Sequence, residues 1–402
     1  MAPPPRLPGR RFLHVPGPTT LPDEVLDAMH RQPMDLGDPR VADNIAACED
    51  GLRQLMAGRE AALFFHASNG HGAWEAVTSN LLAPGQTALV PGTGHFSESW
   101  ARQTEALGRR ARRTPWIEGR PIDAEAVAQA LRDDRGHEIG AVFVVHTDTA
   151  SGITSDIDAL RRAIDDAGHP ATLVVDAVAS LGAAPLRMDA QRIDVLVGAS
   201  QKGLMCPPGL GFAAVQPAVM ARVRANPAPR HYFDWVAREG RLPYQKFCGT
   251  PPLTLMQGVQ AGLGLLLDEG LEAVWARHRR LASLVHAAVD AWRTSGALDF
   301  YGREPAARSA SVTAIRTAEG VDPDAIRRVA RERFDVAVAG GLGPLAGRAF
   351  RIGHLGDLNV PMVLGALGGV EAALTVLGVP YGAGGLAAAI ARAASDTSAA
   401  PL

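Results

Sequence analysis

The two lysines are the first residues whose type suggests chemistry. The chain has 402 residues, of which 40 are Lys or Arg, and all of these except Lys202 and Lys246 are arginine. Arginine keeps its charge in proteins, whereas lysine can lose a proton when its surroundings lower its pKa and can then act as an amine nucleophile. A lysine retained in so arginine-rich a chain is a candidate for Schiff-base chemistry, with a chance surface position as the alternative.

An aspartate stands one structural step before Lys202. Asp176 ends the apolar run 172–177, and Lys202, 26 residues later, follows the apolar run 194–199. This spacing is typical of one strand-helix-strand unit, so both side chains should emerge at the same edge of a parallel sheet. Pyridoxal phosphate needs such a pair: an amine to form the imine and an acid to keep the pyridine nitrogen protonated. A helix N-cap is the structural alternative for Asp176.

Short apolar runs alternate with helix-period segments between about residue 60 and about residue 215. Continuous hydrophobicity over strand length is typical of strands buried on both faces. Apolar residues at helical spacing over 157–167 predict a crossover helix between two of them. The fold class is therefore α/β, an open and largely parallel sheet covered by helices, with its ligand site at the carboxyl ends of the strands. The predicted strands are 61–66, 87–91, 141–146, 172–177, 194–199 and 211–215.

The pattern changes near residue 256 to long helical stretches followed by shorter α+β segments. We expect an N-terminal arm over 1–18, a large domain over 19–269 and a small C-terminal domain over 270–402. The end of the chain after about residue 393 is small and polar, which predicts a mobile tail.

Composition and charge favour a small-molecule function. A formal net charge of −2 gives no global field for nucleic acid or an anionic membrane. The most membrane-like segment, near the C-terminus, is interrupted by Glu371 and Pro380, and no signal peptide is expected. Three scattered cysteines, Cys48, Cys206 and Cys248, exclude a disulfide framework or a clustered metal site and fit a reducing, cytoplasmic location.

Five segments in the same order resemble the class V (fold type I) aminotransferases, in particular the branch that uses glyoxylate as amino acceptor. The resemblance implies a fold type I pyridoxal phosphate transferase, with a large domain on a mostly parallel sheet and a smaller C-terminal α+β domain. The segments are 68–76 (SNGHGAWEA), 146–158 (HTDTASGITSDID), 174–190 (VVDAVASLGAAPLRMDA), 198–212 (GASQKGLMCPPGLGF) and 340–359 (GGLGPLAGRAFRIGHLGDLN).

The resemblance also implies catalytic and substrate-binding residues. Lys202 would hold the cofactor and shuttle a proton between it and the amino acid, and Asp176 would pair with the pyridinium. Arg351 would bind the substrate carboxylate, which a guanidinium can grip with two hydrogen bonds. Thr250 would reach the cofactor phosphate of a neighbouring subunit, which implies a homodimer.

Residues that bind the cofactor phosphate are implied at two places. Asn69, Gly70 and His71 precede a helical run, so their backbone N–H groups would hold an anion at the helix N-terminus. Relatives are expected to carry Ser at position 69. Ser200 and Gln201, beside the lysine, match further positions of the same phosphate cradle.

The remaining implied contacts surround the pyridine ring. Phe96 matches an aromatic residue that stacks on one face, Val178 would cover the other, and Thr149 corresponds to a hydroxyl that binds the ring oxygen. Relatives tend to have Tyr within 247–249, where this chain has Phe-Cys-Gly. Lys246 is expected to be a structural or surface charge.

The resemblance implies transfer of the amino group of serine, alanine or aspartate to a small 2-oxo acid by a ping-pong mechanism. Glyoxylate is the expected acceptor. Alternatives are a pyruvate-using or pyridoxamine-linked transaminase, a lyase or desulfurase of the same fold, and a non-catalytic pyridoxal phosphate-binding regulator. A desulfurase is disfavoured because Cys206 and Cys248 are poorly placed for a nucleophile on a mobile loop. A nicotinamide enzyme is disfavoured because Pro344 and Gly347 break the glycine spacing.

Overall fold

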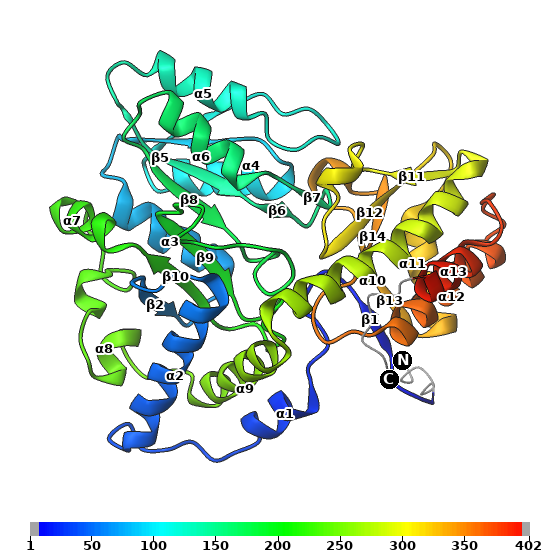
Figure 1. The fold of residues 1–402 in the computed structure, drawn as a ribbon, viewed down its shortest axis with the longest axis horizontal. Coiled ribbons are helices and arrows are strands. Elements are labelled where there is room, and N and C mark those ends of the chain that lie inside the picture. Colours follow the sequence, from blue (N-terminus) through cyan, green and yellow to red (C-terminus); the bar gives the residue numbers. More distant parts are fainter. Residues whose placement is uncertain (1–7, 396–402) are drawn as a thin grey trace, which may run out of the picture.

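Two β-sheets organise the chain (Figure 1), whose computed structural model describes residues 8–395. The larger sheet has the strand order β2-β10-β9-β8-β5-β3-β4, and only β10 runs antiparallel to its neighbours. This confirms the predicted α/β class with a mostly parallel sheet. Its strands are β2 (Ala62–His66), β3 (Thr87–Val90), β4 (Arg110–Arg113), β5 (Ile139–Val145), β8 (Thr172–Asp176), β9 (Val195–Ala199) and β10 (Gly211–Val215).

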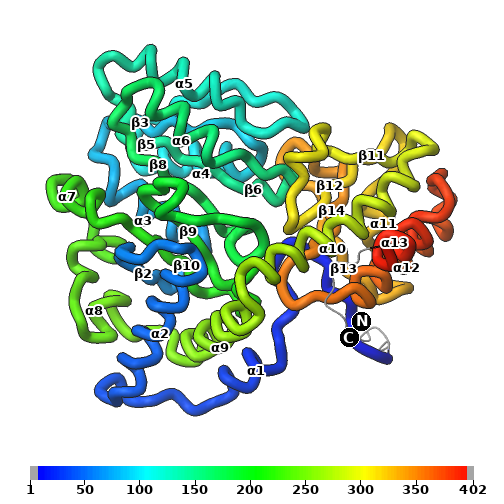
Figure 2. Tube along the Cα trace, in the orientation of Figure 1, coloured from blue at the N-terminus to red at the C-terminus, as the bar shows by residue number. Residues whose placement is uncertain are grey.

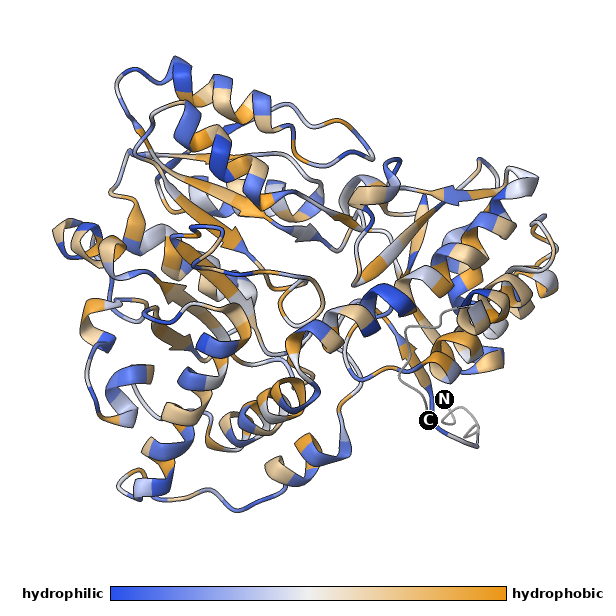
Figure 3. Ribbon diagram, viewed as in Figure 1, coloured by the Kyte–Doolittle hydropathy of each residue, from blue (hydrophilic) through white to orange (hydrophobic). Residues whose placement is uncertain are grey.

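Helices cover both faces of this sheet, as continuously apolar strands require. Successive residues of β5 point to opposite faces, so Val142 and Val144 pack in one core cluster while Phe143 and Val145 pack in the other. The central strands are accordingly largely apolar in Figure 3, whereas the helices are two-sided. One face carries α2 (Pro39–Met56), α5 (Ala124–Asp133), α6 (Ile157–Asp166) and α9 (Leu253–Glu269), and the other α3 (Gly70–Leu81), α4 (His95–Ala106) and α7 (Pro217–Ala225).

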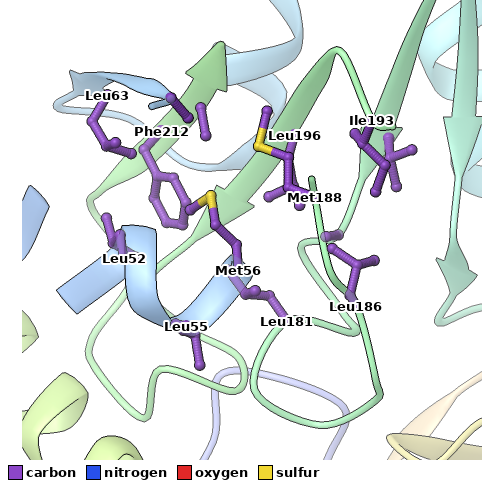
Figure 4. Packing of buried hydrophobic residues seen from close by; sticks show 14 of the residues in the cluster. Leu52, Leu55, Met56, Leu63, Leu181, Leu186, Met188, Ile193, Leu196 and Phe212 are labelled. Atoms are coloured by element: carbon purple, nitrogen blue, oxygen red, sulfur yellow. The ribbon is translucent and has the colours of Figure 1, made fainter. Parts of the chain in front are cut away.

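The cluster under α2 shows how this packing is built (Figure 4). Leu52 and Met56 point from α2 toward Phe212 on β10, and Leu55 and Leu196 on β9 belong to the same cluster. All five side chains are buried. Such interdigitated side chains hold the strands, and therefore the strand ends, in fixed positions.

The smaller sheet has the order β1-β13-β14-β12-β11 and mixed strand directions. Its first strand comes from the N-terminal arm: Phe12–His14 pairs in parallel with β13, beside which the blue end of the chain runs in Figure 2. The strands are β1 (Phe12–His14), β11 (Leu298–Phe300), β12 (Val312–Thr317), β13 (Val336–Gly340) and β14 (Ala349–Gly353), and α10 (Leu271–Trp292), α11 (Pro323–Phe334), α12 (Val360–Val376) and α13 (Gly385–Ser395) pack against them. The remaining elements are α1 (Asp23–Met29), α8 (Pro243–Phe247) and the ribbon β6 (Thr147–Asp148) and β7 (Ile153–Thr154).

We propose the boundary between the two domains at residues 269–270, as predicted from the sequence. Gly270, with a φ of 85°, separates α9 from α10 there. Helix α13 extends to Ser395, and the rest of the predicted tail and the first seven residues of the predicted arm lie outside the described residues. Within 8–395, no helix is long and apolar enough to cross a membrane.

Candidate active site

A cavity of about 230 Å³ lies at the carboxyl ends of the central parallel strands. Its position follows from the sheet: Asp176, the last residue of β8, pairs with Val145 on β5 and with Val197 on β9. The turn after β9 brings Lys202 to the same cavity, as the strand-end argument predicts. The lining residues are Asn69, Gly70, His71, Trp74, Phe96, Val145, Thr147, Thr149, Asp176, Val178, Ala179, Gln201 and Lys202.

Asp176 is a buried carboxylate held by two neutral donors. The Val178 backbone N–H donates to Oδ1 at 2.7 Å, and the Trp74 indole N–H donates to Oδ2 at 3.1 Å. Burial raises the pKa of Asp176 to about 7, against the lowering by these donors, while Asp148 raises it and Lys202 lowers it through space. A cationic N–H placed in the cavity would therefore stabilise the charged carboxylate.

Residues of the N-terminal arm form hydrogen bonds with both the side chain and the backbone of Lys202. Its Nζ donates to the Pro16 carbonyl oxygen, and the Thr19 hydroxyl donates to the Lys202 carbonyl oxygen at 3.0 Å. Gly17 has a φ of +126°, and a Cβ there would stand 2.5 Å from Lys202 Cδ, so the arm can pass only as glycine. Burial and the charge of Arg351 lower the pKa of Lys202 to about 8. At pH 7 roughly one amine in ten would then be neutral, against about one in a few thousand for a free lysine.

The N-terminus of α3 forms one end of the cavity. Asn69 caps this helix by accepting the His71 backbone N–H on Oδ1 at 3.0 Å, so the residue that departs from the expected Ser performs the capping role. A Cβ on Gly70 would stand 3.0 Å from Val178 Cγ2. Gln201 also lines the cavity, and its Oε1 is buried and has no hydrogen-bond partner among the residues described. A helix N-terminus suits an anionic group.

Phe96 and Thr149 are held by the buried carboxylate of Asp148. Its Oδ2 accepts the Phe96 backbone N–H at 3.0 Å, and its Oδ1 accepts the Ala150 backbone N–H at 2.8 Å. The Phe96 ring is partly buried and lies edge-on to Trp74, with ring centroids 6.4 Å apart. Asp148 thus fixes two segments that line the cavity, a role the sequence analysis did not assign.

Three predicted site residues do not line the cavity. The Ser200 hydroxyl donates to the Pro207 carbonyl oxygen at 2.6 Å and accepts the Leu210 backbone N–H, so its side chain closes the turn after β9 instead of joining the cradle. Thr250 is exposed beyond α8. Arg351, on β14, does not line the cavity but contacts the backbone of Thr149, which does.

Arg351 is nonetheless well ordered by its partners. Its Nε donates to the Gly340 carbonyl oxygen at 2.6 Å and its Nη1 donates to the Thr149 carbonyl oxygen at 2.8 Å. It is buried, and burial lowers its pKa to about 10. The second bond links the smaller sheet directly to the cavity wall.

Four lining residues, Trp74, Val145, Thr147 and Ala179, were missed from the sequence. Trp74 carried a usable signal, because it lies about one turn into a helix whose first residues were already assigned to the site. The other three are small or apolar and resemble core residues. Within residues 8–395, no group of three or more His, Cys, Asp or Glu side chains could hold a metal ion.

The chain is similar to known proteins over nearly its whole length. The family model for "Aminotransferase class-V" matches residues 11–345. Serine–glyoxylate aminotransferase from Methylorubrum extorquens is 40% identical over 392 residues, covering 96% of this chain and 96% of that protein. L-aspartate–glyoxylate aminotransferase from Paracoccus denitrificans is also 40% identical, covering 96% and 97%.

Solved structures agree over the same length. Ureidoglycine–glyoxylate aminotransferase from Bacillus subtilis superposes with a TM-score of 0.87 at 26% identity, covering 96% of this chain and 99% of the other. Pyridoxamine–pyruvate aminotransferase from Mesorhizobium loti gives a TM-score of 0.86 at 28% identity, covering 96% and 97%. These likenesses extend through both sheets.

Proposed function

Because the chain belongs to the class V aminotransferases, which are pyridoxal phosphate-dependent enzymes, we propose that it moves the amino group of a small amino acid to glyoxylate in a ping-pong cycle. Serine, alanine and aspartate are the proposed donors. The observation that carries the proposal is the single cavity that holds Lys202, Asp176 and the N-terminus of α3 together.

The residues of the cavity fit the cofactor part by part. The N-terminus of α3 at Gly70 and the side-chain amide N–H of Gln201, both at the cavity, would suit the phosphate. Lys202 would hold the cofactor, and the buried Asp176 would pair with its pyridine nitrogen. We further propose that Phe96 and Val178 cover the two ring faces and that Thr149 binds the ring oxygen. When bound, pyridoxal phosphate supplies an aldehyde that takes up the amino group and a ring that withdraws electrons.

Lys202 and Asp176 would have different acid–base roles. The Nζ of Lys202, with its pKa lowered to about 8, can both release and take up a proton near neutral pH. Asp176 would pair with a protonated ring nitrogen, and that positive charge would offset the cost that burial places on the charged carboxylate.

The amino donor is the open part of the proposal, since the two relatives at 40% identity are named for serine and for aspartate. Holoenzyme should be mixed with serine, alanine, aspartate and pyridoxamine, each against glyoxylate and pyruvate, while visible absorption and product are followed. We expect one of the three amino acids with glyoxylate to give the highest kcat/KM. Turnover only with pyridoxamine and pyruvate would replace this proposal by the pyridoxamine-linked alternative, and a spectrum unchanged by every donor would overturn both.

A desulfurase reaction gains no support from the cysteines. Cys206 is buried, its S–H donates to the Leu204 and Gly258 carbonyl oxygens at 3.1 and 3.4 Å, and burial raises its pKa to about 12. A thiol of that kind is not a nucleophile at neutral pH. Cys248 does not line the cavity.

Replacing Arg351 by alanine is expected to raise KM for carboxylate substrates by about 10- to 100-fold, because a charge-assisted hydrogen bond contributes about 1.5–3 kcal/mol. The bonds from Nε and Nη1 to carbonyl oxygens fix the plane of this guanidinium. Arg348→Ala is the control, since Arg348 is exposed on the approach to β14. Steady-state kinetics with both substrates would measure KM for each variant. An unchanged KM in Arg351→Ala would show that another residue binds the substrate carboxylate.

We also propose a homodimer in which Thr250 contributes to the neighbouring site. Thr250 is exposed and does not line the cavity of its own chain. The stretch before it exposes several large apolar side chains, which a second subunit would cover. They are Tyr232, Val236, Leu242 and Tyr244.

A further inference from the structure

We propose that Trp74 is a positioning residue, whose indole N–H holds the Asp176 carboxylate in the orientation needed to pair with the cofactor's ring nitrogen. The inference rests on the proposed function. It assigns a task to a residue that neither the sequence motifs nor the strand-end argument identified.

The hydrogen bonds of Asp176 divide evenly between its two oxygens. Oδ1 accepts from Val178 and Oδ2 accepts from Trp74, at 2.7 and 3.1 Å. A carboxylate has about four lone-pair sites, so one donor on each oxygen fixes its plane and leaves acceptor capacity toward the cavity. With only the Val178 bond, the group could rotate about its Cβ–Cγ bond.

The Trp74 ring cannot easily turn its N–H away. It stacks on Trp100, with centroids 5.1 Å apart and planes 7° apart, and Trp100 stacks on Phe143 at 4.5 Å and 12°. The three rings come from α3, α4 and β5, and all are buried. The stack thus joins two helices to the strand beside β8 and sets the direction of the indole N–H.

The same hydrogen bond acts on the charge of Asp176. The groups that face this carboxylate are Asp148 from β6, which raises its pKa, and Lys202 from the turn after β9, which lowers it. Burial raises the pKa most, and the Trp74 and Val178 donors lower it. Without the indole donor the carboxyl would keep its own proton up to a higher pH, and a neutral carboxyl cannot form an ion pair with the pyridinium.

The test compares Trp74→Phe with Trp100→Phe. Phenylalanine at position 74 keeps an aromatic ring and removes the donor. Phenylalanine at position 100 keeps a ring to stack on Trp74 and removes an N–H that has no partner among the described residues. Full-length apoenzyme of each is titrated with pyridoxal phosphate and with 1-deazapyridoxal phosphate, in which carbon replaces the ring nitrogen. We expect Trp74→Phe to weaken pyridoxal phosphate binding about 10- to 100-fold, the range for a hydrogen bond to a charged group.

Three further results are expected if Trp74 acts through Asp176. Trp100→Phe should bind pyridoxal phosphate within about threefold of the native enzyme, a change of under 1 kcal/mol. The loss in Trp74→Phe should disappear with the deaza analogue. The pH below which pyridoxal phosphate affinity falls should be higher in Trp74→Phe, because deprotonated Asp176 binds the cofactor and its pKa has risen.

Equal losses in the two variants, or an equal loss with both ligands, would show that Trp74 only packs and would overturn the inference. If Trp74→Phe does not fold, as judged by circular dichroism, benzothienylalanine at position 74 keeps the ring shape and removes only the N–H. Failure of the proposed function is recognised separately, because native holoenzyme would then show no transamination of serine, alanine or aspartate with glyoxylate, whatever the binding results for the Trp74 variant.

Discussion

Lys202→Ala should lose transamination almost completely, with kcat reduced by about 10⁴-fold, the upper end of what general acid–base groups contribute. The Nζ is the cavity group that can both hold the cofactor and move a proton near neutral pH, because burial lowers its pKa to about 8. Phosphate and ring contacts remain, so the variant should still bind pyridoxal phosphate noncovalently. Single-turnover absorbance with the best donor measures the loss.

The chain supplies its own control for this experiment. Lys246 is its only other lysine, and it pairs with Glu49, Nζ to Oε1, at 2.5 Å. Lys246→Ala should therefore keep its activity. Borohydride treatment of the native holoenzyme should attach the cofactor to the peptide containing position 202, as seen by mass spectrometry. Full activity in Lys202→Ala, or attachment at position 246, would refute the assignment.

Asp176→Asn should lower kcat by about 100-fold, the equivalent of losing about 3 kcal/mol from one charge-assisted contact. The amide has the same shape as the carboxylate but cannot balance a protonated ring nitrogen. Native enzyme should lose cofactor affinity as the pH falls through about 7, where Asp176 takes up a proton. The variant should lack this pH dependence, which a titration from pH 5 to 9 would reveal.

A matched carboxylate lies at the other end of the strands. Asp194, just before β9, accepts the Leu173 backbone N–H at 2.7 Å and does not line the cavity. Asp194→Asn should affect the stability of the sheet and leave the pH profile of cofactor binding in place. If both variants changed kcat and this profile alike, Asp176 would be a structural residue.

The central strands were predictable because burial on both faces leaves them apolar along their whole length. The edge strand β4 was not predictable in this way, since its sequence Arg-Ala-Arg-Arg has no apolar face and its strand character comes from pairing with β3. Charged edges of this kind also discourage pairing with other chains.

The site could be predicted where chemistry follows directly from strand ends. Asp176 and Lys202 are one step apart on parallel neighbours, so topology alone brings them together. Ser200 shows where such prediction fails. It lies two residues before Lys202, but the sequence does not reveal that its hydroxyl donates to a carbonyl oxygen within the turn. Trp74 and the arm residue Pro16 reach the site only through tertiary packing, which no local pattern encodes.

The segment that follows strand β1 lies against the proposed reaction centre. Strand β1 is anchored in the smaller sheet, and a few residues later Pro16 and Thr19 touch Lys202. Val15 lies directly against Gly353, at the end of the strand that carries Arg351. One short segment therefore joins the lobe that carries Arg351, the proposed carboxylate ligand, to Lys202, and we expect a shift of that lobe to move the amine with it.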